Sequence, residues 1–229
     1  MTDDTHDTDG AAIDGAHDTA AVPAVRAQLL ATEHWSLLAT RGMTWSEVMG
    51  RIAIHLTVAS ASLVVLALVT QATGFGTAFE VLSIGLTAAV LVLGTLTGIR
   101  VHNASVDDAA MLVGMNRLRA AYVELDPGME RFLVTGWHDD IAGLTRTYTM
   151  GARRRTLSHV LGSTSIFMVA VNSMLAGTLG ALVADASGAG VALVTVCGVL
   201  AGLAYLGVML EVGRRSFASA PPEVRFPST

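Results

Sequence analysis

The 229-residue chain contains no lysine, so its positive charge comes from 14 arginines alone. Its single cysteine, Cys197, excludes an intramolecular disulfide and any cysteine cluster for metal or redox chemistry. Charged residues make up only 14% of the chain, whereas 52% of the residues are hydrophobic. A soluble domain of this size could not bury so much apolar sequence, so the composition favours a membrane protein.

Four apolar runs are close to the ~20 residues that a helix needs to cross the hydrocarbon core of a bilayer. They cover residues 52–70, 81–99, 160–184 and 191–209. The predicted fold class is therefore all-α: a polytopic membrane protein with four transmembrane helices, arranged as two hairpins with a small cytoplasmic helical cap.

The arginines all lie on one side of these runs. They precede the first run, separate the second from the third, or follow the fourth, and the short connections at 71–79 and 185–190 contain none. Because arginine-rich short loops stay cytoplasmic, both termini and the middle segment are predicted to be cytoplasmic. Abundant alanine, glycine and valine beside arginine without lysine suggest a high-GC bacterial source. The predicted location is thus the bacterial plasma (inner) membrane, crossed several times.

The N-terminal region divides into three predicted segments. Residues 1–22 hold six of the 19 acidic residues and have no apolar period, which predicts a disordered acidic tail. From Pro23, apolar residues recur at helical spacing, which predicts an amphipathic cytoplasmic helix over 23–43. This helix either lies on the inner membrane surface through Trp35 or packs against other cytoplasmic helices. Gly42 is expected to break it, and the capping-box pattern Thr44-x-x-Glu47 to begin the first hairpin.

The remaining segments follow from the apolar runs: a first transmembrane hairpin at 44–100, a cytoplasmic helical segment at 101–155, a second transmembrane hairpin at 156–213, and a cytoplasmic tail at 214–229. The middle segment is too short for an independent domain. We expect its apolar stripes to pack on each other, on the N-terminal helix or on a second subunit.

Titratable side chains lie at the predicted cytoplasmic ends of all four spans: His55, His102, His159 and Glu211. They could form a pH-responsive gating cluster, because histidine titrates near neutrality. They could also hold zinc or iron, or be ordinary interfacial residues paired with headgroups and arginines. The sequence assigns no metal ion or cofactor to them.

The middle of the membrane is almost free of ionisable groups, unlike the interior of coupled ion transporters. Asn172 is the most polar residue at that depth. It could line a pore or make a hydrogen bond between helices.

Three pairs of small residues with a spacing of four indicate close helix packing. They are Gly94 with Gly98, Gly198 with Gly202, and Ala176 with Gly180. The sequence does not decide whether these pairs join helices of one chain or of several copies.

No phosphate-binding loop, nucleophile elbow or zinc-protease helix is present, so we do not expect an enzyme. The one dense polar patch of the middle segment is Trp137-His138-Asp139-Asp140. Its aspartates could help to bind a metal, although an Asp helix cap beside a histidine is the commoner use of such a pattern.

The residues from Arg100 to Ala110, Arg-Val-His-Asn-Ala-Ser-Val-Asp-Asp-Ala-Ala, are followed by Met-Asn-Arg-Leu-Arg-Ala-Ala-Tyr at 115–122. These stretches resemble four-span integral membrane proteins of actinobacteria to which no activity is assigned. The resemblance covers most of the chain beyond the acidic tail. It implies the four-span fold, and it transfers no functional residue.

Together these features predict a homo-oligomeric ion channel or pore that is gated from the cytoplasmic side. The alternative is a non-catalytic membrane scaffold or accessory protein that recruits cytoplasmic partners. The predicted partners are membrane lipids and further copies of the chain, with a cytoplasmic protein as a further candidate. Nucleic acid is not expected, because the formal charge of −5 comes mainly from the tail and the rest is nearly neutral.

The predicted topology can be tested with reporter tags inserted after Gly74 and after Ala186. Because the loops at these positions contain no arginine, both tags are expected on the outer side of the membrane. Accessibility of the tags to an impermeant reagent in intact cells measures this. A tag found inside the cell contradicts the topology.

Overall fold

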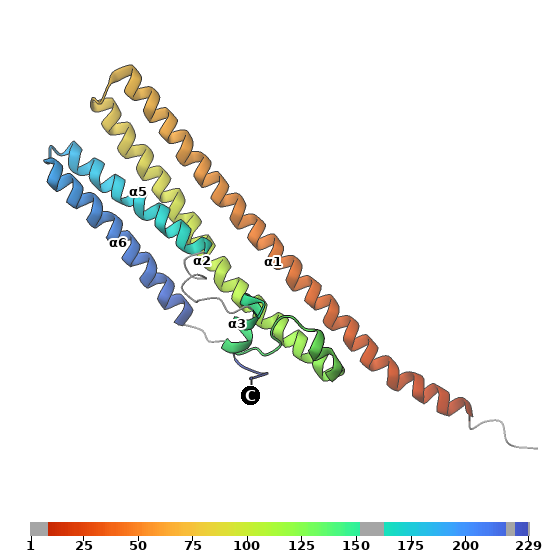
Figure 1. The fold of residues 1–229 in the computed structure, drawn as a ribbon. Coiled ribbons are helices and arrows are strands. Elements are labelled where there is room, and N and C mark those ends of the chain that lie inside the picture. Colours follow the sequence, from red (N-terminus) through yellow and green to blue (C-terminus); the bar gives the residue numbers. More distant parts are fainter. Residues whose placement is uncertain (1–8, 152–162, 219–222, 229) are drawn as a thin grey trace, which may run out of the picture. The chain divides into compact units, whose positions relative to one another are not determined.

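The structure is a computed structural model that describes residues 9–151, 163–218 and 223–228 (Figure 1). Every regular element in these ranges is a helix, which confirms the predicted all-α fold. The elements are α1 (Asp9–Thr73), α2 (Thr77–Leu125), the 3-10 helix η1 (Pro127–Phe132), α3 (Ile141–Thr149), α5 (Thr164–Ala186) and α6 (Val191–Ala218).

Four of these helices, α1, α2, α5 and α6, are long and apolar enough to cross a membrane. At most 22% of the residues in their apolar stretches are buried within the chain. Most of their large apolar side chains therefore face outward, where lipid or other copies of the chain can cover them. The prediction of a multi-pass membrane protein is confirmed.

The described residues form two compact units. The membrane unit comprises residues 43–108 and 163–218, and the polar unit comprises residues 9–42, 109–151 and 223–228. The helices α1 and α2 each supply residues to both units.

The helix α1 is continuous where the sequence predicted breaks. It begins at Asp9, inside the segment expected to be disordered, and it contains Pro23 in its interior rather than at its start. It also continues through Gly42, because a single glycine costs a helix only about 1 kcal/mol relative to alanine. The first eight residues of the predicted tail lie outside the described ranges.

The predicted capping box is therefore wrong. The carboxylate of Glu47 accepts hydrogen bonds from Arg51 Nε at 2.9 Å and from Arg100 Nη2 at 2.8 Å. It joins α1 to α2 instead of closing a helix end. The boundary predicted at residue 100 likewise falls inside α2, which runs without interruption to Leu125.

One face of α2 forms the centre of the membrane unit. Its buried residues are spaced alternately by four and three positions: Ser83, Thr87, Val90, Gly94, Thr97, Val101, Ala104 and Asp108. This 3.5-residue repeat is the period of left-handed, knobs-into-holes helix packing. All eight residues are small or medium-sized, so neighbouring helices can approach α2 closely.

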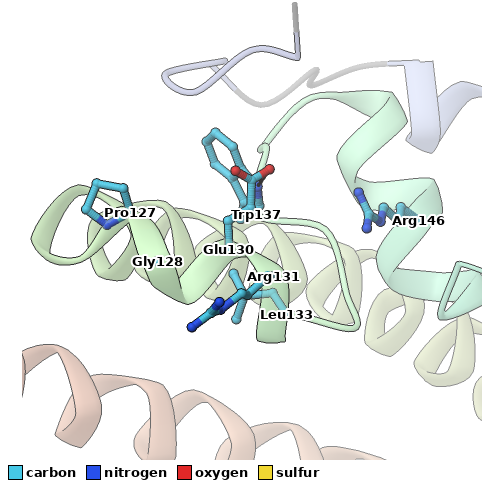
Figure 2. Close-up of a pocket in the computed structure, with 7 residues that line it drawn as sticks. All are labelled: Pro127, Gly128, Glu130, Arg131, Leu133, Trp137 and Arg146. Carbon is cyan, nitrogen blue, oxygen red and sulfur yellow. Dashed lines mark hydrogen bonds between the residues drawn. The ribbon is translucent and has the colours of Figure 1, made fainter.

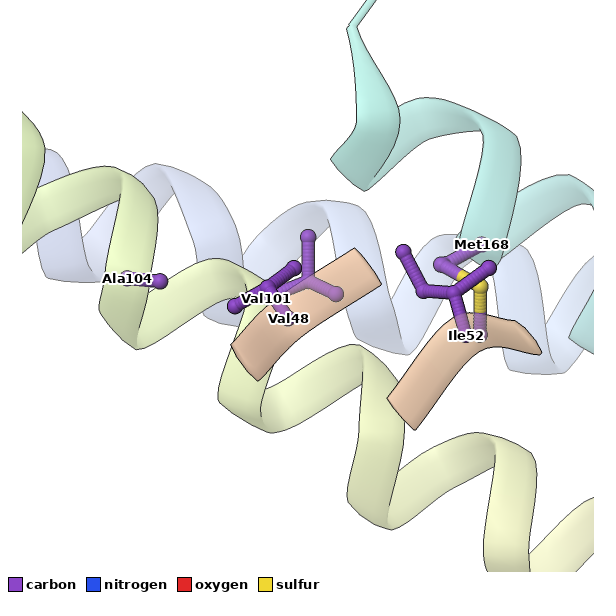
Figure 3. Packing of buried hydrophobic residues seen from close by; sticks show 5 residues of the cluster. All are labelled: Val48, Ile52, Val101, Ala104 and Met168. Atoms are coloured by element: carbon purple, nitrogen blue, oxygen red, sulfur yellow. The ribbon is translucent and has the colours of Figure 1, made fainter. Parts of the chain in front are cut away.

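A dry apolar cluster, here called the plug, lies on this face (Figure 3). It consists of Val48, Ile52, Val101, Ala104 and Met168, from α1, α2 and α5. Four of the five are completely buried, and Ile52 is 7% exposed. Beside the plug, the Trp45 indole donates a hydrogen bond of 2.8 Å to the buried carboxylate of Asp108. The plug therefore joins three helices and contains no polar side chain.

The helix α6 is attached to α2 and α5. The hydroxyl of Tyr205 lies 3.0 Å from that of Thr95 on α2. Against α5, the backbones themselves are in contact, because a Cβ added at Gly198 would stand 3.0 Å from the carbonyl oxygen of Gly177.

In the polar unit, the C-terminal segment 223–228 is bound by two aspartates. Asp139, which is 1% exposed, accepts hydrogen bonds from the backbone N–H groups of Arg225 and Phe226 and from Arg117 Nε at 2.8 Å. Asp140 accepts from the backbone and the hydroxyl of Ser228. The segment predicted as a plain tail is therefore part of the folded polar unit.

Asp140 also confirms the interpretation of the Trp137–Asp140 patch as a helix cap. It is the N-cap of α3, and its side chain accepts a hydrogen bond of 2.8 Å from Gly143 N. The hydrogen bonds from Ser228 and Gly143 lower the pKa of Asp140 to about 2. Burial alone would raise the pKa of Asp139, but the bonds from Arg117, Arg225 and Phe226 lower it overall.

Replacing Asp139 with Asn tests this attachment. Asp139→Asn removes the charge that three donors share, so amide hydrogen exchange at Arg225 and Phe226 is expected to accelerate about tenfold or more. Asp126→Asn is the control, because Asp126 caps η1 in the same unit and accepts from Gly128 N. Unchanged protection in Asp139→Asn contradicts the attachment.

The attachment is also expected to depend on pH. Because folding lowers the pKa of both aspartates, their contribution is fully present above about pH 4 and is lost at lower pH, that of Asp140 as the pH falls through its pKa of about 2. Hydrogen exchange of segment 223–228, corrected for intrinsic rates, measures it. Protection that persists at pH 2 contradicts this assignment.

Candidate functional site

Three helices of the membrane unit meet at Gly94. A Cβ added there would overlap Asn172 Oδ1 of α5 and would stand 2.7 Å from His55 Cε1 of α1. The glycine therefore makes room for both polar side chains, which are 2% (His55) and 1% (Asn172) exposed. We call His55, Gly94 and Asn172 the polar cluster.

The polar cluster contains hydrogen-bonding atoms without partners. Both ring nitrogens of His55 and the Oδ1 atom of Asn172 are buried, and none of them has a hydrogen-bond partner among the described residues. Leaving a buried donor or acceptor unpaired costs about 1–3 kcal/mol. Such groups are uncommon in proteins, and an ordered water or an ion commonly pairs with them. Single ring nitrogens of other histidines, among them His34 and His138, are in the same situation, whereas the polar cluster combines three such atoms.

A small cavity begins one helical turn from the polar cluster on α1 and α2. Ala59 follows His55 by four residues, and Val90 precedes Gly94 by four. The cavity has a volume of about 90 Å³ and is lined by Ala59, Ser62, Leu63, Leu66, Leu86, Thr87, Val90 and Leu175. It can hold a few water molecules, since one water occupies about 30 Å³ in the liquid.

The plug lies on the other side of the polar cluster along both helices. Val48 and Ile52 precede His55 on α1, and Val101 follows Gly94 on α2. Arg100 lies at the same end, about 9 Å along α2 from Gly94 at 1.5 Å per residue. The polar cluster thus has a largely apolar cavity, with Ser62 and Thr87 in its lining, on one side and the buried apolar plug on the other.

The other predicted boundary residues lie elsewhere. The ring of His102 is in van der Waals contact with the position of a Cβ at Gly213 on α6, at 4.0 Å. Glu211 binds Arg214 and Arg215 on its own helix, at 2.8 Å and 2.7 Å. His159 lies outside the described ranges. Of the boundary residues that the structure describes, His55 is therefore the one that approaches Gly94 together with Asn172.

Within the described ranges, no group of three or more His, Cys, Asp or Glu side chains is arranged to hold a metal ion. The polar cluster itself offers one imidazole and one amide. This pair is a poor ligand set for zinc or iron, which take more nitrogen, sulfur or carboxylate ligands.

The small-residue pairs have different uses. On α6, Gly198 and Gly202 face the backbone of α5, where a Cβ at residue 202 would meet the carbonyl oxygen of Ser173 at 3.0 Å. Gly180 of α5 approaches α6 through Ala201. On α2, Gly94 accommodates side chains, and Gly98 lies next to the Asn172 amide. All these contacts form within one chain, so none of them is a reason to infer assembly.

Comparisons of the chain with protein-family models, with curated proteins and with solved structures find no match. The resemblance to actinobacterial four-span proteins therefore remains a prediction. The function must be inferred from the geometry of the site.

Asn172 was predicted from the sequence as a candidate residue, whereas the stripe of small residues on α2 that lies beside it was missed. The signal was available, because small residues recur on α2 at alternating intervals of four and three. The sequence could not predict which side chains pack against Gly94. The approach of His55 and Asn172 to that glycine depends on the relative placement of three helices.

Replacing Gly94 with Ala tests the close approach. The new methyl group would overlap the Asn172 amide, so Gly94→Ala is expected to destabilise the protein by about 1–3 kcal/mol. Gly85→Ala is the matched control on the same helix, because a Cβ at Gly85 meets nothing within 4 Å. Unfolding titrations in mixed micelles measure both variants, and equal stability of the two contradicts the packing.

Proposed function

We propose that the protein is a membrane channel for protons or small ions, with the polar cluster as the narrow polar point of its path. The observation that supports this most is the set of unpaired polar atoms of His55 and Asn172, buried inside apolar helices next to a cavity. Polar groups inside a membrane protein commonly mark the path of an ion or proton. No Asp, Glu, Lys or Arg lines that cavity, which favours passive conduction over coupled transport.

In this proposal the plug is the closed gate. An apolar constriction stops ions without any blocking group, because water and charge avoid it. Val48, Val101 and Met168 are completely buried, so the described conformation corresponds to a sealed state. The plug lies at the end of the path next to Arg100, which agrees with gating from the predicted cytoplasmic side.

We further propose that several copies assemble. The cavity of about 90 Å³ holds only a few waters, so this cavity by itself is too small for a wide aqueous pore. Protons could pass along a short water chain within one copy, whereas hydrated ions would need a pore between copies. Lipid or neighbouring copies could cover the exposed apolar faces of the four spans.

The second candidate function is a membrane scaffold that recruits a cytoplasmic protein. The part of α1 in the polar unit exposes Val25, Leu29 and Trp35, at 54%, 66% and 71%. Exposed apolar side chains of this kind favour contact with a partner or a membrane surface. A stable stoichiometric partner in a pull-down, together with no ion flux, would favour the scaffold.

Shape-conserving changes in the plug test the channel. Val48→Thr and Val101→Thr add a hydroxyl to the seal at nearly constant volume, so they are expected to raise ion or proton flux into liposomes severalfold. Val64→Thr is the control, because Val64 lies on the same helix as Val48 and is 60% exposed. Fluorescent indicators for protons, K⁺ and Cl⁻ inside the liposomes measure the flux between pH 5 and 8.

Two outcomes count against the channel. The first is that neither the wild type nor the plug variants conduct any of the three ions. The second is that Val64→Thr changes the flux as much as Val48→Thr does, which would mean that the plug does not control conduction.

A further inference from the structure

Most arginines in the part of the chain that the structure describes are paired. In the described ranges, most of them bind a carboxylate or a side-chain amide of the same unit: Arg26, Arg51, Arg100, Arg117, Arg119, Arg214, Arg215 and Arg225. Arg41 also has a partner. Arg131 and Arg146 are the described arginines whose side chains make no hydrogen bond or ion pair.

These two arginines line the same cavity in the polar unit (Figure 2). Arg131 comes from η1, and Arg146 from the last turn of α3. The cavity has a volume of about 560 Å³. Ligand pockets usually measure about 300–1,000 Å³, so this one has the size of a small-molecule site.

The remaining lining residues complete a site of mixed character. Trp137 forms an aromatic wall, and its indole donates a weak hydrogen bond of 3.4 Å to Glu130 Oε1. Leu133, Pro127 and Gly128 supply apolar and backbone surface. Arg131 also stacks over the neighbouring Phe132 ring, with its guanidinium carbon 4.7 Å from the ring centre. Two guanidinium groups against one carboxylate leave a net positive charge.

We propose that this cavity binds a phosphate ester that carries hydroxyl groups. Guanidinium groups match the geometry and charge of phosphate oxygens, which they bind through two parallel N–H donors. Glu130 disfavours a bare anion and favours a ligand that also brings a hydroxyl donor. The same chemistry occurs in a soluble glycerol phosphate or sugar phosphate and in the headgroup of phosphatidylglycerol. This inference is independent of the proposed channel.

The test uses the full chain in neutral detergent. Titration calorimetry with glycerol 3-phosphate measures the soluble ligand, and native mass spectrometry with phosphatidylglycerol measures the lipid. Glycerol and phosphatidylcholine are the control ligands, since the first lacks a phosphate and the second lacks hydroxyls and net charge.

The variants Arg131→Ala and Arg146→Ala are each expected to weaken binding about tenfold or more, because each loses a charge-assisted contact. Arg131→Lys and Arg146→Lys keep the charge without the planar pair of donors and should lie between these variants and wild type. Arg26→Ala is the matched control, because Arg26 is an exposed arginine of the same unit that pairs with Glu124. It should bind within about twofold of wild type.

Binding of glycerol 3-phosphate supports a soluble ligand, and selective binding of phosphatidylglycerol supports a lipid headgroup. The proposal is overturned if wild type binds neither, or if Arg131→Ala and Arg146→Ala bind as tightly as Arg26→Ala. Unfolding temperatures equal to that of wild type establish that lost binding is not lost folding.

Discussion

The absence of a side chain at Gly94 is the constraint on which the membrane unit depends. Because no Cβ is present there, His55 of α1 and Asn172 of α5 can both reach the same point on α2. The rest of the buried face of α2 is also small, with Ser83, Thr87 and Thr97 among its members. Membrane helices gain little from burying apolar surface against each other, so close van der Waals contact and a few polar contacts must hold them. The small residues on α2 meet that requirement and define where the polar cluster can form.

The polar cluster and the plug have opposite energetic effects. The side chains of the plug are apolar and need no hydrogen-bond partners, so dense packing alone stabilises them. Three buried atoms of the polar cluster have no hydrogen-bond partner among the described residues, and an unpaired buried atom lowers stability. The membrane unit is therefore less stable than it would be with an apolar residue in place of His55. This difference is the physical reason for assigning a function to the polar cluster rather than a purely structural role.

In the polar unit, charge has two different uses. Asp139 and Asp140 accept hydrogen bonds from backbone N–H groups of segment 223–228, so this segment is folded onto the polar unit. Paired arginines such as Arg117 belong to that network and stabilise it. Arg131 and Arg146 have no such partners, and they face a cavity of small-molecule size. The distinction between paired and unpaired arginines separates structural charges from candidate binding residues.

The sequence by itself determined the all-α class, the four apolar spans and the Asp140 helix cap. Apolar length and local capping depend on neighbouring residues only, so they can be inferred without a fold. The sequence misplaced the helix boundaries at Gly42 and Glu47, because the carboxylate of Glu47 finds arginines on α1 and α2 rather than a helix end. Only the tertiary structure decided that His55 and Asn172 both approach Gly94, that Gly198 packs on α5 and that segment 223–228 returns to Asp139. Each of these contacts joins residues far apart in the chain, and their meeting depends on how whole helices pack rather than on any local pattern.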